Sequence, residues 1–494
     1  MAHQTAVALD FLVIGGSSAG LSAAYALRRV GHRVLVLEQN ADFFDERRCG
    51  GYRIPPNMSK VFYHWGLEER VRKLCLKSNM TTFSRFESGE GLGSHVWVDE
   101  LMRETGGDFL FARLADIRKF LYQLGHEAGA KFRANAKVVH VDVAGASVTL
   151  ASGEVLRADV IIGADGRNGL CRELLLECQP APRSSYTGIT MYNALIPGEK
   201  VRADPQLSNT LLNVLQAQYV WFGNGCAGML FEAGNNSDMG LHLYVPDEED
   251  REIDWNCTVE EMLRYSSGAE SQQVLQKFAR LAVNVSRVPV YDESDLEDWV
   301  HDNGPLVLIG DSAHPMPPGS IQGTCMAIED SAVLAKLFGH LISRDQVSSF
   351  LYAFPELRQG RTKSTRVNEM GNIYFMAMPD DAGAIQRDQH FKARRDKNLS
   401  PLEDESGDAS GVWESIKETW CYDAEDEADD WWVGWGMLRL RSQQTELNFG
   451  MELQVSESIA LSRSSRLMHS PEHSTFSSSR RPIIIFFDVF LLAR

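Results

Sequence analysis

One segment near the start of the chain limits the possible folds more than any other. The apolar run Phe11 to Ile14 is typical of a buried parallel strand, and a glycine-rich turn follows at residues 15–20. A helical pattern extends from Leu21 to Val30, and a second apolar strand, Val34 to Leu37, ends in Glu38. These pieces form a β-α-β unit of about 30 residues, the length that a right-handed crossover between parallel strands requires.

The turn carries the residue types that a dinucleotide site needs. Gly15 can make the tight turn with Gly16, Ser17 is small enough for the backbone to approach a pyrophosphate, and Gly20 lets the helix meet the strand. Glu38 can bind a ribose hydroxyl and would repel a 2′-phosphate. With both strands and the helix in place, the pattern predicts a site for FAD or NAD, which this motif alone does not separate.

A second turn follows a short buried strand. Val160 to Ile162 leads into Gly163-Ala164-Asp165-Gly166, and Arg167 and Arg172 come soon after. An Asp-Gly turn is common in proteins, but with two arginines at a strand end it can hold a pyrophosphate.

A third turn follows the apolar strand Pro305 to Ile309. Its Asp311 can hydrogen-bond a polyol, and a proline-rich loop containing Pro318 leads into a helix that begins near Gln322 and Gly323. The start of a helix is positive and stabilises an anion, so this one would suit a reduced flavin.

With these three motifs in this order, the chain resembles the aromatic-ring flavoprotein monooxygenases, the family of the 4-hydroxybenzoate and salicylate hydroxylases. It is most similar to the salicylate-hydroxylase-like branch. Residues 310–330 match the family without a gap, and Gly51 with the loop Ile54 to Asn57 fits the family's loop after the second strand. The resemblance covers roughly residues 8–375.

The resemblance implies roles for individual positions. The glycine turn and Glu38 would hold the ADP part of FAD, Asp311 the ribityl or pyrophosphate region, and Pro318 would lie against the isoalloxazine. The family has an arginine two residues before an Asp; here Asp116 has Leu114 at that spacing, so Arg113, one residue further back, is the candidate. The implied cofactor-binding set is Gly15, Gly16, Ser17, Gly20, Glu38, Gly51, Arg113, Asp165, Gly166, Asp311, Pro318, Gln322 and Gly323.

The resemblance also implies the reaction. NADH or NADPH would reduce bound FAD, O2 would give a C4a-hydroperoxyflavin, and its distal hydroxyl would be transferred to an aromatic or phenolic small molecule, with or without decarboxylation. His242 and Tyr244, on one face of a predicted substrate-domain strand, are the candidate catalytic residues. Two alternatives stay open: epoxidation of an alkene-containing metabolite, and flavin binding without turnover.

The expected fold is α/β: a Rossmann-like FAD-binding domain with an inserted, mainly antiparallel β-sheet substrate domain. We expect the FAD-binding domain at 1–175 and 288–395, and the substrate domain at 176–287. Residues 396–440 read as an acidic, Trp-rich helical segment whose tryptophans pack on the FAD-binding domain. Residues 441–494 are serine-rich and are predicted to be disordered.

Composition narrows the function further. Of 494 residues, 49 are Lys or Arg and 67 are Asp or Glu, a net charge of −18 that argues against nucleic-acid binding. The eight cysteines show neither C-x-x-C pairs nor zinc spacing, so we expect no metal site and an intracellular, cytoplasmic protein. No signal peptide and no transmembrane segment is expected.

Overall fold

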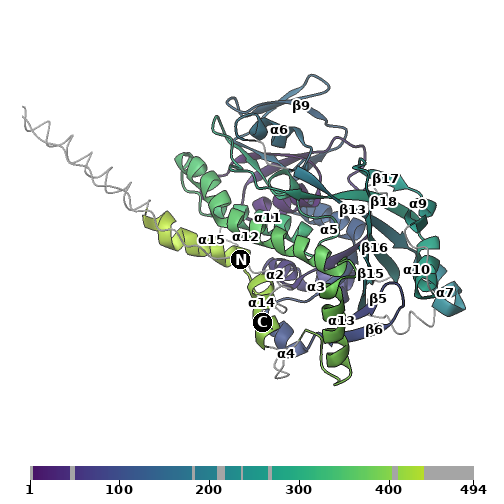
Figure 1. The fold of residues 1–494 in the computed structure, drawn as a ribbon. Coiled ribbons are helices and arrows are strands. Elements are labelled where there is room, and N and C mark those ends of the chain that lie inside the picture. Colours follow the sequence, from purple (N-terminus) through teal and green to yellow (C-terminus); the bar gives the residue numbers. More distant parts are fainter. Residues whose placement is uncertain are drawn as a thin grey trace, which may run out of the picture.

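A computed structural model describes residues 4–44, 50–180, 184–207, 217–234, 237–264, 270–402 and 410–438 (Figure 1). The tail predicted to be disordered, residues 441–494, lies outside the described residues. Within the described part, none of the helices combines the length and the apolar character that a membrane crossing requires.

A five-stranded parallel sheet forms the first part of the molecule, with strand order β19-β12-β1-β2-β8. Its strands are β1 (Asp10–Ile14), β2 (Arg33–Leu37), β8 (Lys131–Arg133), β12 (Val160–Gly163) and β19 (Leu306–Leu308). The three predicted strand-turn motifs follow β1, β12 and β19, which are neighbours in the sheet. Their turns therefore meet at one sheet edge.

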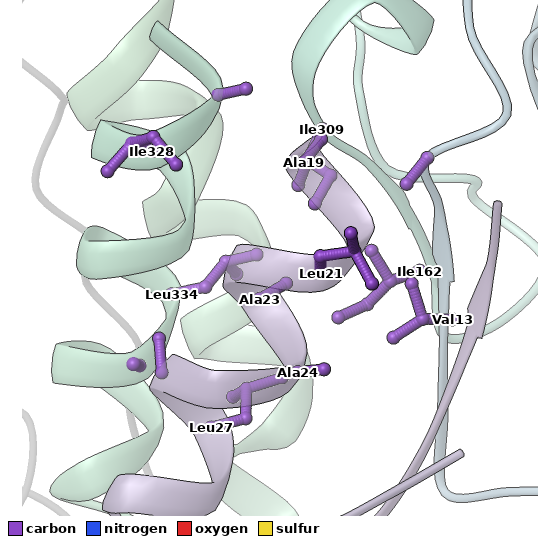
Figure 2. Close-up of a cluster of buried hydrophobic side chains, with 14 of the residues drawn as sticks. Val13, Ala19, Leu21, Ala23, Ala24, Leu27, Ile162, Ile309, Ile328 and Leu334 are labelled. Carbon is purple, nitrogen blue, oxygen red and sulfur yellow. The ribbon is translucent and has the colours of Figure 1, made fainter. Parts of the chain in front are cut away.

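The helix α1 (Ser18–Arg29) joins β1 to β2, so the predicted β-α-β unit is confirmed. Ser17 is its N-cap and accepts a hydrogen bond from the amide of Gly20. Figure 2 shows side chains of α1 between Val13 and Ile162 of the sheet and residues of α11 (Gly323–Gly339). The fully buried Ala23 and Ala24 contribute little bulk, which allows α1 and α11 to pack closely.

Two small antiparallel sheets accompany the parallel sheet, with the orders β11-β10-β9 and β3-β7-β4. Their strands are β9 (Val138–Asp142), β10 (Ser147–Leu150), β11 (Val155–Arg157), β3 (Gly51–Ile54), β4 (Leu76–Lys77) and β7 (Leu110–Arg113). Shorter helices fill this part of the chain: α2 (Pro56–His64), α3 (Glu68–Leu74), α4 (Asp99–Glu104), α5 (Leu114–Glu127) and α6 (Leu170–Leu176).

An eight-stranded sheet forms the second part, in the order β17-β18-β13-β16-β15-β14-β5-β6. Its strands are β5 (Met80–Arg85), β6 (Gly91–Val96), β13 (Ser184–Ile196), β14 (Ala217–Phe222), β15 (Ala227–Ala233), β16 (Asp238–Pro246), β17 (Asp254–Cys257) and β18 (Asn284–Glu293). All its pairings are antiparallel except β14 with β5, which is parallel. The sheet thus takes two strands from residues 80–96, outside the range 176–287 expected for the substrate domain.

Helices α7 (Gly198–Ala203), α9 (Val259–Leu263) and α10 (Glu270–Arg280) accompany the eight-stranded sheet. The long helix α12 (Val347–Met376) links the two parts, and α13 (Ala382–Arg395) follows it (Figure 1). The first turns of α12 place Phe350 and Phe354 in the core under the parallel sheet, whereas its last turns place Ile373 and Phe375 in the core of the eight-stranded sheet.

The acidic, Trp-rich segment forms α14 (Ser410–Trp420), α15 (Ala424–Trp431) and a short π-helical turn (Trp432–Gly436). Trp431 packs into the core of the parallel-sheet part, whereas Trp420 belongs to the core of the eight-stranded sheet. Trp435 is 64% exposed. The tryptophans of this segment are therefore divided among both parts of the molecule and the solvent.

The two parts make a close backbone crossing where β3 meets β16. A Cβ atom added to Gly240 would lie 2.5 Å from the Cα of Gly51, and one added to Gly51 would lie 2.6 Å from the Cα of Gly240. Such distances are too short for any side chain, so both positions require glycine for lack of space rather than for backbone conformation.

We expect Gly240→Ala to lower the free energy of unfolding, measured in urea, by about 1–3 kcal/mol, because the backbones must separate to admit the methyl group. The matched control is Gly360→Ala within α12, where an added Cβ meets nothing within 4 Å. There the change should raise stability by about 0.5–1 kcal/mol, because alanine favours a helix. Equal effects at the two sites would contradict the crossing.

Candidate functional site

A groove runs along the edge of the parallel sheet where the three turns meet. It encloses about 1060 Å³ of empty space, counting its opening to solvent. The predicted cofactor residues that line it are Ser17, Gly51, Gly166, Asp311, Pro318 and Gly323, and His242 lines it as well.

The glycine turn holds two strand ends together at the floor of this groove. Gly15 has a φ of +109°, and a Cβ atom on it would lie 2.3 Å from the carbonyl oxygen of Ala164. A Cβ on Gly20 would lie 2.0 Å from the carbonyl oxygen of Gly15. The hydroxyl of Ser17 donates to the Ala164 carbonyl at 3.0 Å, so this serine ties β12 to α1 as well as capping the helix.

Glu38 lies against the same turn from the end of β2. Its carboxylate accepts hydrogen bonds from the amide of Gly16 at 2.8 Å and from the amide of Asn40 at 2.9 Å. The side chain is 8% exposed. A carboxylate fixed beside the first turn of the β-α-β unit is in the place where a ribose hydroxyl would be bound.

Asp165 does not line the groove but holds the residues that do. Its carboxylate accepts hydrogen bonds from the amide of Cys171 at 3.0 Å and from the hydroxyl of Ser312 at 3.1 Å. Burial raises the pKa of this carboxyl group. Ser312 in turn accepts the amide of Gly166 at 2.7 Å, so its hydroxyl joins the second and third motifs.

Asp311 lies in a single 3-10 turn, η3 (Gly310–Ser312), with its side chain exposed to the groove. The surrounding protein raises the pKa of its carboxyl group by desolvation, which the charge of His314 and the amide of Met316 partly oppose. After η3 the chain passes through Pro318, whose carbonyl oxygen accepts the hydroxyl of Tyr244 at 2.8 Å.

Seven of the thirteen predicted cofactor residues do not line the groove: Gly15, Gly16, Gly20, Glu38, Arg113, Asp165 and Gln322. Arg113 approaches Asp238 at 3.6 Å and is not among the groove-lining residues, whereas Leu114 beside it is. Another arginine, Arg118, donates to the carbonyl oxygen of Gly16 at 3.1 Å. The role of Arg113 in holding the cofactor stays a prediction.

Gln322 is 2% exposed and is not among the groove-lining residues but lines the neighbouring cavity. Its side-chain oxygen accepts the amide group of Asn57 at 2.9 Å, and its backbone amide donates to Glu369 at 3.1 Å. Glu369 also accepts the amide of Ile321 at 3.2 Å, so a carboxylate already occupies the amides just before α11. Gly323, the first residue of the helix, remains on the groove wall.

A second cavity, here called the apolar cavity, lies beside the groove and encloses about 1220 Å³, its opening included. Aromatic side chains from several elements line it: Phe83, Trp97, Phe109, Phe222, Tyr244, Phe375 and Trp420. Arg53, Gly319 and Ser320 line both the apolar cavity and the groove, so the two spaces share this wall.

His242 and Tyr244 lie next to that wall on β16. A Cβ atom on Gly319 would come within 2.6 Å of the Tyr244 hydroxyl and 3.1 Å of His242 Nδ1. Burial, aided by the charge of Arg53, lowers the pKa of His242 to about 3, so the ring is neutral at pH 7. Its Nδ1 has no hydrogen-bond partner among the described residues. Burial raises the pKa of Tyr244, which therefore keeps its proton.

Several residues of the site were not predicted from the sequence. Arg53 and Glu369 are buried charges in the wall of the apolar cavity, and Leu402, Ile416, Thr419 and Trp420 reach it from the C-terminal segment. Trp420 packs against Trp97 and Phe109, with ring centroids 5.0 and 5.4 Å apart. Arg53 lies in the sequence between Gly51 and the loop Ile54 to Asn57, both of which fit the family's pattern. This position was the only feature of the sequence that could have indicated Arg53 as a site residue.

Comparisons with known proteins agree with this geometry. The sequence profile described as "FAD binding domain" matches residues 8–365. The chain is 26% identical over 423 residues to the FAD-dependent monooxygenase OpS4 of Beauveria bassiana, covering 84% of this chain and 94% of that protein. It is also 26% identical over 380 residues to 3-hydroxybenzoate 6-hydroxylase of Klebsiella oxytoca, covering 74% and 89%.

Among solved structures, a salicylate hydroxylase in complex with substrate has the same fold, with a TM-score of 0.65 and 20% identity over 85% of this chain and 97% of that one. The fold, the profile and the relatives define a class: an FAD-dependent monooxygenase. The chain belongs to the FAD-binding family of aromatic-ring flavoprotein monooxygenases. The resemblance and the α/β fold class drawn from the sequence are thereby confirmed, as is FAD as cofactor.

We expect Asp311→Ala to weaken FAD binding by about tenfold or more, because the predicted role of this carboxylate is to accept hydrogen bonds from the cofactor. Titration of the apoprotein with FAD, followed by flavin fluorescence, measures this, and Asp311→Asn separates charge from shape. The matched control is Asp10→Ala at the other end of β1, where Asp10 forms an exposed ion pair with Arg33. Undiminished affinity in Asp311→Ala would contradict the role given to this residue.

Proposed function

We propose that the protein hydroxylates an aromatic or phenolic small molecule with O2 and electrons from NADH or NADPH, with or without loss of a ring carboxyl group. The observation that carries this proposal is the apolar cavity that shares a wall with the groove at Arg53, Gly319 and Ser320. A cavity lined by aromatic and aliphatic side chains fits a ring-sized ligand. Because of the shared wall, a ring bound there would lie next to a cofactor in the groove.

The groove has the features that an FAD site needs. It offers room at Gly166, where an added Cβ would meet nothing within 4 Å, and the exposed Asp311. The carboxylate of Glu38 lies beside the glycine turn, where it accepts the amide of Gly16. At the far end the groove offers the unpartnered Nδ1 of His242. When bound, FAD supplies the redox chemistry, taking up electrons and activating O2. The residues of the chain bind and orient it.

Tyr244 and His242 would control protons at the wall between the two spaces. The Tyr244 hydroxyl keeps its proton at neutral pH and already donates it to the carbonyl oxygen of Pro318, so towards a ligand its oxygen can act as a hydrogen-bond acceptor. His242 can accept a hydrogen bond at Nδ1, but with a pKa of about 3 it would take up a proton only in acid. A general base works best with a pKa near the working pH, so both residues fit hydrogen bonding to a ligand better than proton abstraction before it binds.

The cavity lining would exclude water from the reaction. Phe222 and Phe109 are fully or almost fully buried in the core that surrounds the cavity, and Trp420 of α14 covers another side. Exclusion of water strengthens the polar interactions within a site and limits side reactions of activated oxygen. Helix α14 is therefore part of the proposed substrate site.

The proposal is tested by adding FAD to the purified protein and following NADH and NADPH oxidation with and without a panel of phenolic acids. We expect a ring compound to accelerate oxidation and to yield a product that carries one oxygen atom from labelled O2. Carbon dioxide released in step with the product would show that hydroxylation replaces a carboxyl group.

Each other outcome points to a different function. Oxygen transfer to alkene-containing compounds but not to phenols would identify an epoxidase. Bound FAD with no nicotinamide oxidation under any condition would point to flavin binding without turnover. Nicotinamide oxidation that produces only peroxide with every ring compound would contradict the proposed hydroxylation.

A further inference from the structure

Arg53 is a buried cation placed at the boundary of two cavities. It lies on β3, is 4% exposed, and lines both the apolar cavity and the groove. A guanidinium has five N–H donors and no acceptor, and it keeps its charge in nearly every protein environment. Its position next to a ligand-sized space therefore requires an explanation.

The partners of this guanidinium are all neutral. Nη1 contacts the side-chain oxygen of Gln218 at 3.4 Å and the sulfur of Met229 at 3.2 Å, and Nη2 donates to the carbonyl oxygen of Gly319. The ring of Phe231 lies 5.5 Å from the guanidinium carbon. In the part of the chain that the structure describes, no carboxylate lies within ion-pair distance of Arg53.

Three other buried arginines among the described residues have carboxylate partners. Arg358 pairs with Glu329 at 2.8 Å and with Asp330 at 2.9 Å, Arg366 pairs with Asp295 at 2.8 Å, and Arg387 pairs with Asp388 at 2.9 Å. A buried charge without an ionic partner is costly, and burial accordingly lowers the pKa of Arg53. An anion bound beside Arg53 would remove this cost.

Glu369 does not serve as the ionic partner of Arg53. It lines the same cavity and its charge acts on Arg53, but both its oxygens accept backbone amides, those of Ile321 and Gln322. Burial raises the pKa of Glu369, which favours its neutral form. The cavity wall therefore keeps a positive charge that a ligand can neutralise.

The Nη1 end of the guanidinium lies among residues of the apolar cavity, whereas the partner of Nη2, Gly319, lines both spaces. Gln218 and Met229, the two partners of Nη1, line the apolar cavity and are not among the groove-lining residues. Apart from Arg53 and Glu369, whose two oxygens already accept backbone amides, that cavity presents mainly apolar and uncharged side chains. Arg53 is therefore the one lining residue with which an anionic ligand group could form an ion pair.

We propose that Arg53 is the residue that selects the substrate by binding an anionic oxygen on its ring, either a carboxylate or an ionised phenol. The inference rests on the proposed function only in taking the apolar cavity as the substrate site. The position of Arg53 therefore predicts that the substrate is an anion. It also predicts the orientation of the substrate, with the anionic group towards the wall shared with the groove.

The test measures binding rather than turnover, so that it can fail independently of the proposed hydroxylation. Calorimetric titration of the FAD-loaded protein compares matched acid and amide probes: benzoate with benzamide, and salicylate with salicylamide. We expect each acid to bind more tightly than its amide by about tenfold or more, the value of a charge-assisted hydrogen bond. For phenols, affinity that rises with pH as the hydroxyl ionises would assign the phenolate, and affinity of the acids that is constant with pH would assign the carboxylate.

Arg53→Gln should abolish the preference for acid over amide while leaving the affinity for the amides within about twofold. Arg53→Lys, which keeps the charge but not the planar fork, should retain part of the preference. The matched control is Arg387→Gln. Arg387 is a buried arginine that packs behind the cavity on Phe222 at 4.4 Å and is paired with Asp388. Its replacement should leave the preference unchanged.

Three results would overturn the proposal. Wild-type protein could bind acids no more tightly than amides and also bind phenols no more tightly as their hydroxyl ionises, including no measurable binding of any acid or phenol at about 10 mM. The preference could survive Arg53→Gln. The substitution could instead weaken FAD binding alone and leave the ratio of acid to amide unchanged, which would assign Arg53 to the cofactor. If Arg53→Gln did not fold, a preference fully intact in Arg53→Lys but lost in Arg387→Gln would equally contradict it.

Discussion

The groove exists because the carboxyl ends of β1 and β12 meet with no side chain between them. The backbone of Gly15 lies so close to Ala164 that a Cβ atom would come within 2.3 Å of its carbonyl oxygen. Two serines then connect the neighbouring turns. Ser17 donates a hydrogen bond to the carbonyl oxygen of Ala164. Ser312 accepts a hydrogen bond from the amide of Gly166 and donates one to Asp165, which connects the turn at 310–312 to the turn at 163–166. Three parallel strands thus present backbone and small side chains along one edge, the surface that an extended dinucleotide needs.

A second close approach places the substrate site against that edge. Where β3 crosses β16, Gly51 and Gly240 leave no room for side chains. Residues two positions further along a strand point to the same face, so Arg53 follows Gly51 and His242 follows Gly240 to the boundary of the two cavities. One backbone crossing therefore sets the positions of the buried cation and the neutral imidazole together. This explains how residues far apart in sequence can act on one ligand.

The sequence predicted what is encoded locally and missed what depends on distant packing. The strand-turn motifs at 15–20, 163–166 and 310–311 are each contained within a few residues, and the structure brings all three to one edge. Arg53 was missed because its significance lies in the absence of a carboxylate nearby, which no local pattern reports. Trp420 was missed because α14 is distant in the sequence from most of the other residues that line the cavity, so no local pattern indicates that it lies there. Similarly, β5 joins the eight-stranded sheet by pairing with β14, more than a hundred residues away in the chain. The roles expected for all the predicted cofactor-binding residues, and for His242 and Tyr244, stay predictions.

The most direct test of this account is a crystal structure of the protein with FAD and salicylate. The account predicts the dinucleotide along the groove, with its ribose near Glu38 and its flavin ring beside Pro318 and Gly323. It predicts salicylate in the apolar cavity, with its carboxylate within hydrogen-bond distance of Arg53. A flavin bound outside the groove, or a salicylate carboxylate turned away from Arg53 and towards solvent, would contradict it.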